Sequence, residues 1–299
     1  AKGISNTNEY LYFSDWSANS KNQRIRLNTP QWDSPWNSNA DTDFGYETSA
    51  RINSSSVVFG GSKISGSYRS LSFLTESGSN WTLDTGPVKF TETALGSADA
   101  RIWDMEIHSS SIYVCGLFTD YEIGGVNQGD ISGYAKLDLD GNLDLVGFST
   151  ASSPVYGVTA LGVQSDGKII LGTRYTSNAA QQYLLGWDYN NGYENIPGFS
   201  LGYYPGQLIR LNADGTFDDT FNYPNISSGY STDFQIASQS ESLVPTGSIV
   251  DITILPDDRI VVMGQFATYY DSASLNEVDH LRGMVVLESN GGLISTPVI

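Results

Sequence analysis

The chain has 299 residues, of which 33 are acidic and 15 are basic, so its formal net charge is −18 at pH 7. A balance this acidic lacks the basic surface that nucleic acids and anionic membranes require, and no apolar run approaches the length of a membrane span. The composition therefore argues against a nucleic-acid-binding or membrane-inserted protein, and its excess of Ser, Asn, Thr, Gly and Tyr over Lys is typical of extracellular or virion surface proteins.

The N-terminal part of the chain contains two divergent copies of a strand-rich unit. In the first copy, Asn8–Trp16 (NEYLYFSDW) resembles a second strand and Gln23–Asn28 (QRIRLN) a third strand, and Asp41–Phe44 (DTDF) ends the unit. The second copy contains Gly60 at the end of an apolar strand. Its segment Gly78–Gly86 (GSNWTLDTG) is only weakly similar to the Asp-rich and Asn-rich turns of the later copies. We expect these two units to occupy residues 1–47 and 48–98.

Three clearer copies follow, and each has an alternating apolar strand, a short polar turn, a second apolar strand and a glycine. These segments are Ala100–Phe118, Val155–Tyr175 and Gly247–Phe266. A third strand and a turn rich in Asp, Asn and Gly follow in each copy, within Gly133–Asp144, Gln207–Phe221 and Gly283–Leu293. The dipeptides Asp140-Gly141, Asp214-Gly215 and Asn290-Gly291 predict two-residue hairpin turns with positive φ angles. Period-2 alternation of this kind indicates antiparallel sheets.

The glycine that closes the second strand marks the repeat length. Gly60, Gly116, Gly172 and Gly264 are separated by 116 − 60 = 56, 172 − 116 = 56 and 264 − 172 = 92 residues. Insertions at about 176–206 and 222–246 account for the long last step. The remaining units therefore occupy 99–152, 153–246 and 247–299. A repeated four-strand unit of this length predicts an all-β fold, a single β-propeller domain over residues 1–299 with about five four-stranded blades.

The repeat residues resemble those of the delta-60 repeat β-propeller family. Ser165–Gly172 (SDGKIILG) and Arg210–Phe221 (RLNADGTFDDTF) are similar to the two halves of the family's unit, and the units at 99–152 and 247–299 match in part. The resemblance covers about two-thirds of the chain. It implies a propeller of the kind that occurs in large extracellular and virion-associated proteins, and it implies no particular chemistry.

Oxygen-bearing side chains alternate in one of the Asp-rich turns. These residues are Asp138, Asp140, Asn142 and Asp144. Such alternation suits Ca²⁺, which takes six to eight oxygen ligands, although the spacing is not that of an EF-hand loop. The alternative is a hairpin turn that Asp and Asn close through their own backbone, and we favour it. Calcium at these four residues is the only cofactor that the sequence suggests.

The insertion at about 176–206 predicts a recognition surface because it mixes large aromatic residues with Gly and Asn. Its candidate ligand-binding residues are Tyr183, Trp187, Tyr189, Tyr193, Tyr203 and Tyr204. Tyr and Trp give large contact areas at low entropy cost, and they stack on sugars or anchor protein partners. The alternative is that these rings cover an exposed blade edge or pack against a neighbouring subunit.

Catalysis has little support in the sequence. The two histidines, His108 and His280, lie in no metal-binding spacing, and Cys115 lies in an apolar strand where a buried structural residue is expected. We therefore expect a non-enzymatic component of a virion or extracellular surface, most specifically of a bacteriophage tail or fibre. Its partners would be other proteins of that assembly and a glycan or protein of a host surface. The alternatives are a secreted bacterial adhesin and a glycoside-hydrolase-like propeller with paired carboxylates.

Overall fold

The computed structural model describes a little more than half of the chain. The described residues are 4–6, 10–13, 23–26, 31–32, 44–63, 70–77, 80–84, 87–91, 100–131, 133–146, 158–173, 208–216, 218–221, 248–265, 269–271, 276–278, 284–292 and 294. Every regular element among them is a β-strand, so the all-β prediction is confirmed for this part of the chain. The strands belong to two compact units, Ala1–Ser149 and Thr150–Ile299.

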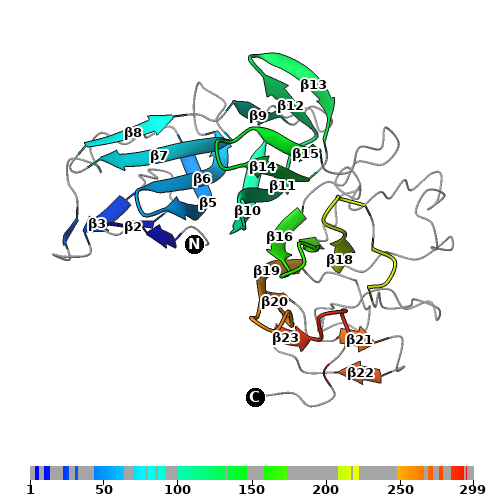
Figure 1. Ribbon diagram of the computed structural model, residues 1–299. Helices are drawn as coiled ribbons and strands as arrows, with labels where there is room; N and C mark the ends of the chain where they lie inside the picture. The colour runs from blue at the N-terminus through cyan, green and yellow to red at the C-terminus, as the bar shows by residue number, and fades with distance from the viewer. Residues whose placement is uncertain are drawn as a thin grey trace, which may run out of the picture. The chain divides into compact units, whose positions relative to one another are not determined.

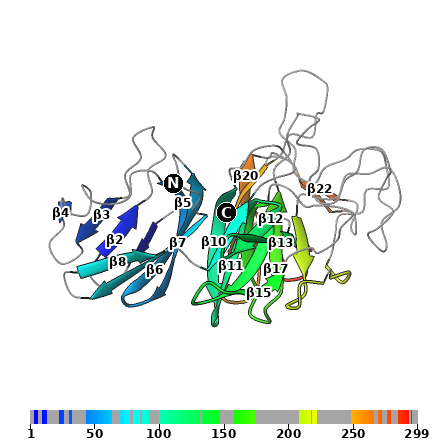
Figure 2. The ribbon, with the colours of Figure 1, turned by 90° about the horizontal axis from the view of Figure 1, so that it is seen from above.

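The N-terminal unit contains three four-stranded antiparallel sheets and a smaller three-stranded sheet (Figures 1 and 2). The first sheet consists of β1 (Ile4–Asn6), β2 (Tyr10–Phe13), β3 (Gln23–Arg26) and β4 (Gln31–Trp32). The second consists of β5 (Phe44–Asn53), β6 (Ser56–Lys63), β7 (Leu71–Ser77) and β8 (Asn80–Asp84). The third consists of β10 (Arg101–His108), β11 (Ser111–Leu117), β14 (Tyr134–Asp138) and β15 (Leu143–Val146). The small sheet consists of β9 (Val88–Thr91), β12 (Asp120–Ile123) and β13 (Val126–Asp130).

The C-terminal unit repeats the same arrangement, with three described strands in each of its two main sheets. One sheet consists of β16 (Val158–Val163), β17 (Ile169–Thr173) and β18 (Leu208–Leu211). The other consists of β19 (Ser248–Ile254), β20 (Ile260–Gln265) and β23 (Met284–Leu287), and β21 (Tyr269–Asp271) pairs with β22 (Asn276–Val278). Each of the five main sheets thus corresponds to one predicted repeat unit.

One predicted boundary differs from the structure, and two hairpins were not predicted. Phe44 was expected to end the first unit, but it is the first residue of β5 and pairs with Lys63. The small sheet was not predicted: β12 and β13 form a hairpin inserted between the second and third strands of their repeat, and β12 also pairs with β9. A hairpin at the same place in the last repeat, β21–β22, was not predicted either.

A β-bulge recurs at the same place in four repeats. The register between first and second strands shifts by one residue around Glu47, Trp103, Thr159 and Val250. On the second strand, the partners of the first-strand residues that precede the bulge are Gly61, Gly116, Thr173 and Gly264. The partners of the first-strand residues that follow the bulge are Gly60, Cys115, Gly172 and Met263. The prediction that Gly60, Gly116, Gly172 and Gly264 are equivalent in the four repeats is therefore wrong. Gly116 and Gly264 pair with the residue before the bulge, and Gly60 and Gly172 pair with the residue after it.

The turns after the third strands have one common geometry. The backbone N–H of Asp138 donates to the carbonyl of Asn142, at 2.8 Å, and that of Gly141 donates to the carbonyl of Asp138, at 3.1 Å. The same two bonds form at Asn212–Thr216 and Glu288–Gly292. The predicted positive φ angles are confirmed at Gly141, Gly215 and Gly291, with values of 85°, 82° and 87°. The predicted two-residue loops are wrong, however, because three residues lie between the bonded pair, with the glycine in the left-handed third place.

Consecutive sheets pack face to face within each unit. In the N-terminal unit, Val58 and Leu71 of the second sheet lie against Ile102, Met105 and Val114 of the third. In the C-terminal unit, the core consists of buried residues from β16–β18 and from β19, β20 and β23: Ala160, Ile170, Leu208, Ile249, Ile252, Ile260, Val262, Val285 and Leu287, together with Phe221 from the turn. Glycine permits this close approach, since a Cβ on Gly60 would lie 2.6 Å from the Ile102 side chain and one on Gly172 would lie 2.5 Å from Ile249. Two faces packed this closely bury a continuous apolar layer, which a single sheet cannot do alone.

Candidate functional site

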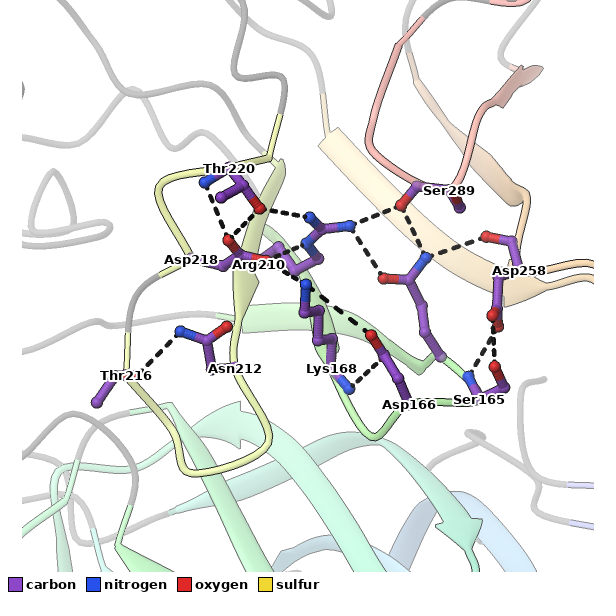
Figure 3. A network of polar contacts seen from close by, with 11 residues as sticks. Ser165, Asp166, Lys168, Arg210, Asn212, Thr216, Asp218, Thr220, Asp258 and Ser289 are labelled. Atoms are coloured by element: carbon purple, nitrogen blue, oxygen red, sulfur yellow. Dashed lines mark hydrogen bonds and ion pairs between the residues drawn. The ribbon is translucent and has the colours of Figure 1, made fainter.

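A network of polar side chains joins the two main sheets of the C-terminal unit (Figure 3). Its centre is Arg210 on β18, whose side chain is 6 % exposed and forms an ion pair with Asp218, 4 % exposed, over an Nε–Oδ2 distance of 2.7 Å. The guanidinium also donates to the Thr220 hydroxyl and lies 4.7 Å from the centre of the Phe221 ring. Buried charges are retained only when they are paired and hydrogen-bonded, and this pair meets that condition.

The residues of this ion pair are adjacent because of the hairpin turn between them. Arg210 lies one residue before the end of β18, and Gly215 reverses the chain with a φ of 82°. Asp218 then returns beside Arg210, where its N–H donates to the Arg210 carbonyl at 3.1 Å. The sequence RLNADGTFD therefore places a cation and an anion, eight residues apart, on the same side of one turn.

Asp218 is held in its charged form. Burial alone would raise the pKa of its carboxyl group, but the Thr220 hydroxyl and N–H donate to Oδ1 and the Lys168 ammonium lies 3.1 Å from Oδ2. These donors, together with Arg210, hold the pKa of Asp218 well below its ordinary value. A carboxylate with this many fixed donors is a structural anion, and it is a poor general acid or base at neutral pH.

Gln164 connects the ion pair to the next sheet. Its Oε1 accepts from Arg210 at 3.3 Å, and its Nε2 donates to the carbonyls of Asp258 and Ser289, at 3.0 and 2.8 Å. Arg210 itself donates to the Ser289 carbonyl at 2.7 Å. Since Asp258 and Ser289 lie in the two turns of the sheet β19–β20–β23, these bonds fix the turns of one sheet against the next.

A second link joins the turn between β16 and β17 to the side chain of Asp258. The Ser165 N–H donates to the Asp258 carboxylate at 2.7 Å, and the Ser165 hydroxyl donates to its other oxygen. Asp258 has a φ of 65°, a left-handed conformation that is strained for a residue other than glycine. Its counterpart in the preceding repeat is Gly167, so the aspartate accepts this strain where its carboxylate contacts the neighbouring turn.

The polar contacts of the network therefore have a structural role, which is to hold the two sheets together. Each polar side chain at its centre contacts other members of the network, and Phe221 packs against Gly291, where a Cβ would lie 2.6 Å from the ring. Within the described part of the chain, no group of three or more His, Cys, Asp or Glu residues is arranged to hold a metal ion. We refer to Gln164, Lys168, Arg210, Asp218, Asp258 and Ser289 as the inter-sheet latch.

The latch makes a prediction about acid stability. Because the pKa of Asp218 is lower in the folded chain than the value of about 3.9 expected after unfolding, its contribution is fully present above about pH 4 and is lost as the pH falls further. The difference in unfolding free energy between the wild type and Asp218→Asn should therefore be largest near pH 6 and should shrink towards pH 2.5. Urea titrations at several pH values measure it, and a difference that does not change with pH would contradict this role.

The third repeat contains a partial copy of the latch. Lys136 and Asp144 occupy the places of Arg210 and Asp218, again eight residues apart, and their side chains lie 2.8 Å apart. This pair is more exposed, at 21 % and 51 %. In the last repeat the same places are occupied by Val286 and Ile294. The repeated cation-and-anion spacing is the signal that could have revealed the latch from the sequence, where it was missed.

The candidate calcium residues form turn contacts. The Asp138 carboxylate accepts the N–H groups of Asp140 and Asn142 and the side-chain amide of Asn142, at 2.8–3.0 Å, and these donors lower its pKa although its partial burial acts to raise it. Asp144 contacts Lys136. The favoured hairpin alternative accounts for these contacts, and calcium binding at the four residues stays a prediction.

The other candidate residues have different outcomes. Tyr183, Trp187, Tyr189, Tyr193, Tyr203 and Tyr204 all lie outside the described residues. Cys115 is fully buried, as expected for a structural residue. Among the residues that the structure describes, there is also no helix long and apolar enough to cross a membrane.

Comparison with known families supports the β-propeller assignment. Residues 203–221 match the model described as "Domain of unknown function (DUF5122) beta-propeller". This segment contains β18, the hairpin turn and the Arg210–Asp218 pair. No curated protein sequence matches the chain.

Several solved structures are similar to the chain at low identity. The extracellular domain of a one-component system of B. thetaiotaomicron has 13% identity and a TM-score of 0.41, with 88% of this chain and 31% of that chain covered. PorZ, a surface component of the type-IX secretion system of Porphyromonas gingivalis, has 11% identity and a TM-score of 0.47, with coverages of 99% and 33%. A protein of unknown function from Bacteroides caccae has 10% identity and a TM-score of 0.34, with coverages of 96% and 92%. The chain thus spans about a third of the length of the first two, and TM-scores below 0.5 do not assign an activity.

Proposed function

We propose that this chain is a non-enzymatic β-propeller of about five blades that acts as a structural and recognition module of an extracellular assembly. The specific assignment is a bacteriophage tail or fibre component, in receptor binding or as an adaptor. The observation that carries the proposal is the inter-sheet latch. Within the family-matched segment, Arg210 is paired with Asp218 and donates to the Ser289 carbonyl of the next sheet, so this segment contributes to a rigid scaffold.

Two further features support the proposal. Repeats three, four and five all have an insertion between their second and third strands, namely β12–β13, residues 174–207 and β21–β22. Segments that project from a rigid scaffold are where binding commonly occurs. A net charge of −18 also favours a soluble partner-binding protein over one that binds nucleic acid.

The location can be tested with antibodies raised against the purified chain. Electron microscopy of particles and cells of the source is expected to show label on the tail or fibre of a virion. Label confined to a bacterial envelope would replace this assignment with the adhesin alternative, and label on neither would overturn both.

The absence of catalysis can be tested in parallel. The chain is incubated with a panel of surface polysaccharides, and binding and chain cleavage are both measured. We expect saturable binding without cleavage. Cleavage that disappears when one carboxylate is replaced by its amide would establish a glycoside hydrolase and contradict the proposal.

A further inference from the structure

The turn between β5 and β6 contains an asparagine with a serine two residues after it. Asn53 pairs with Ser56 where the two strands meet, so Ser54 and Ser55 form the turn itself. Asn53, Ser54 and Ser55 fit the pattern Asn-X-Ser, with X other than proline, that asparagine-linked glycosylation requires. The pattern is short and common in a chain rich in Ser and Thr. The geometry of the turn therefore decides whether Asn53 is suited to the reaction.

The asparagine is accessible, and the backbone around it is held in place. Asn53 and Ser54 are exposed, and Ser55 is half-buried. The N–H of Glu76 donates to the Ser55 carbonyl at 2.8 Å, and Nε of Arg51 donates to the Asn53 carbonyl at 2.9 Å. A glycan is bulky and is attached at the protein surface. The turn therefore presents its asparagine where a glycan can be accommodated.

The asparagine side chain is closed onto the serine of the same turn. Oδ1 of Asn53 accepts the backbone N–H of Ser55 at 2.9 Å and the Ser55 hydroxyl at 3.1 Å. The first of these bonds is that of an Asx turn, in which Asn or Asp binds the backbone two residues further on. Nδ2, the nitrogen that becomes glycosylated, takes part in neither bond. Both donors thus lie on the oxygen of the amide.

This arrangement suits the chemistry of glycosyl transfer to an amide. Nδ2 attacks the anomeric carbon of an activated sugar, and a bond forms between them. The bond from that carbon to the donor's phosphate oxygen breaks, the diphosphate leaves with the electron pair, and one amide proton passes to a base of the transferase. Negative charge accumulates on Oδ1 as this proton leaves, and fixed donors at that oxygen stabilise the charge. In the turn, the Ser55 N–H and hydroxyl are such donors.

A second copy of the pattern provides an internal comparison. Asn80, Trp81 and Thr82 all lie within β8, which pairs with β7 from Asn80 to Asp84. Along an extended strand, residues two apart are separated by about 6.6 Å, and this backbone does not form an Asx turn. A third copy, at Asn225, lies outside the described residues. The structure thus distinguishes Asn53 from Asn80, although the sequence pattern does not.

We infer that Asn53 is an asparagine-linked glycosylation site, which takes its sugar from a donor with a diphosphate leaving group. The donor is a nucleotide sugar or a lipid-linked sugar, since both have this chemistry. The inference goes beyond the proposed recognition role and does not depend on it. In an antiparallel sheet, the turn between the first and second strands lies at the opposite end from the connection between the second and third, where later repeats have their insertions. The glycan would therefore leave the insertion end of its own sheet uncovered.

The test begins with the full-length chain purified from its source. Trypsin cleaves after Arg51 and Lys63 and releases residues 52–63, in which Asn53 is the only asparagine; Asn80 is the only one in residues 70–89. Mass spectrometry with electron-transfer fragmentation should find a sugar on Asn53 and none on Asn80. When variants are produced in the source, Ser55→Ala should lower the occupancy of Asn53 about tenfold or more because one donor to Oδ1 is lost. Ser55→Thr and the control Ser54→Ala should retain the sugar.

Two further reactions identify the donor. The chain without glycan is incubated with UDP-glucose and a soluble extract of the source, or with membranes of the source. Transfer in the first reaction identifies a nucleotide sugar, and transfer in the second identifies a lipid-linked sugar.

Three results would overturn the inference. Residues 52–63 could carry no sugar in the chain from the source, or carry it on a serine. Equal occupancy of Asn53 and Asn80 would show that the turn geometry does not select the site. Ser55→Ala with unchanged occupancy would show that the hydroxyl is not needed. Each of these results leaves the recognition role standing, because the polysaccharide-binding measurement tests that role separately.

Discussion

Replacing Arg210 with methionine is expected to lower the free energy of unfolding of the C-terminal unit by about 3–5 kcal/mol, the cost of leaving a buried charge without its partner. Methionine approximates the length of the side chain but cannot contact Asp218, Gln164 or the Ser289 carbonyl. The Asp218 carboxylate would then remain buried with Lys168 as its remaining cation. Urea unfolding, followed together with hydrogen exchange of the β17 and β18 amides, measures the change.

The chain provides a matched control in the third repeat. Lys136→Met removes a cation from the equivalent place, but Lys136 and Asp144 are 21 % and 51 % exposed, so the loss should be at most about 1 kcal/mol. Arg210→Met and Lys136→Met with equal effects would show that burial of the pair is not what matters. A double variant, Arg210→Met with Asp218→Leu, should recover part of the loss because it removes both charges together.

The sequence predicted the repeated sheets because their cause is local. Alternating apolar residues bounded by Asp-Gly or Asn-Gly specify strands and turns within a few residues, and Gly141, Gly215 and Gly291 have the left-handed conformation that was expected. The loop length was not predicted, because an Asp-Gly dipeptide fits both a two-residue turn and the last two places of a three-residue turn.

The register of the repeats was harder to predict than their existence. The second strands read IILG in one copy and IVVMG in another, so aligning them on glycine moves one copy by a residue. The bulges at Trp103, Thr159 and Val250 give the correct alignment of these strands, because they occupy the same place in each repeat. A bulge depends on pairing with another strand, so the sequence of one strand does not reveal it. The hairpin β12–β13 did have a signal, since Gly124-Gly125 between two apolar residues favours a tight turn.

The candidate site was only partly accessible from the sequence, for a physical reason. The Arg210–Asp218 pair lies across one hairpin, so its spacing is visible in the chain. The remaining partners of the latch include the backbone carbonyls of Asp258 and Ser289, which are far away in sequence. Any residue has a carbonyl, so no residue type marks these acceptors. Contacts of this kind appear only once the two sheets are packed together.

Replacing Gly116 with alanine is expected to destabilise the N-terminal unit by about 3 kcal/mol or more, at or above the upper end of ordinary overpacking in a core. A Cβ at this position would lie 1.8 Å from the Arg101 carbonyl oxygen and 2.8 Å from its carbon. These are backbone atoms of the paired strand β10, next to the bulge at Trp103, so no side-chain rotation can relieve the contact. The bulge itself would have to open.

Gly162→Ala is the comparison that isolates this backbone effect. Its Cβ would also be too close, at 2.9 Å, but to the side chains of Ile252 and Ile254, which can shift. We expect this variant to lose about 1–2 kcal/mol by thermal unfolding, clearly less than Gly116→Ala. If Gly116→Ala proves as stable as Gly162→Ala, the bulge at Trp103 must be pliable. The bulges would then follow from the pairing of the first and second strands. They would not be rigid elements that fix the position of the first strand.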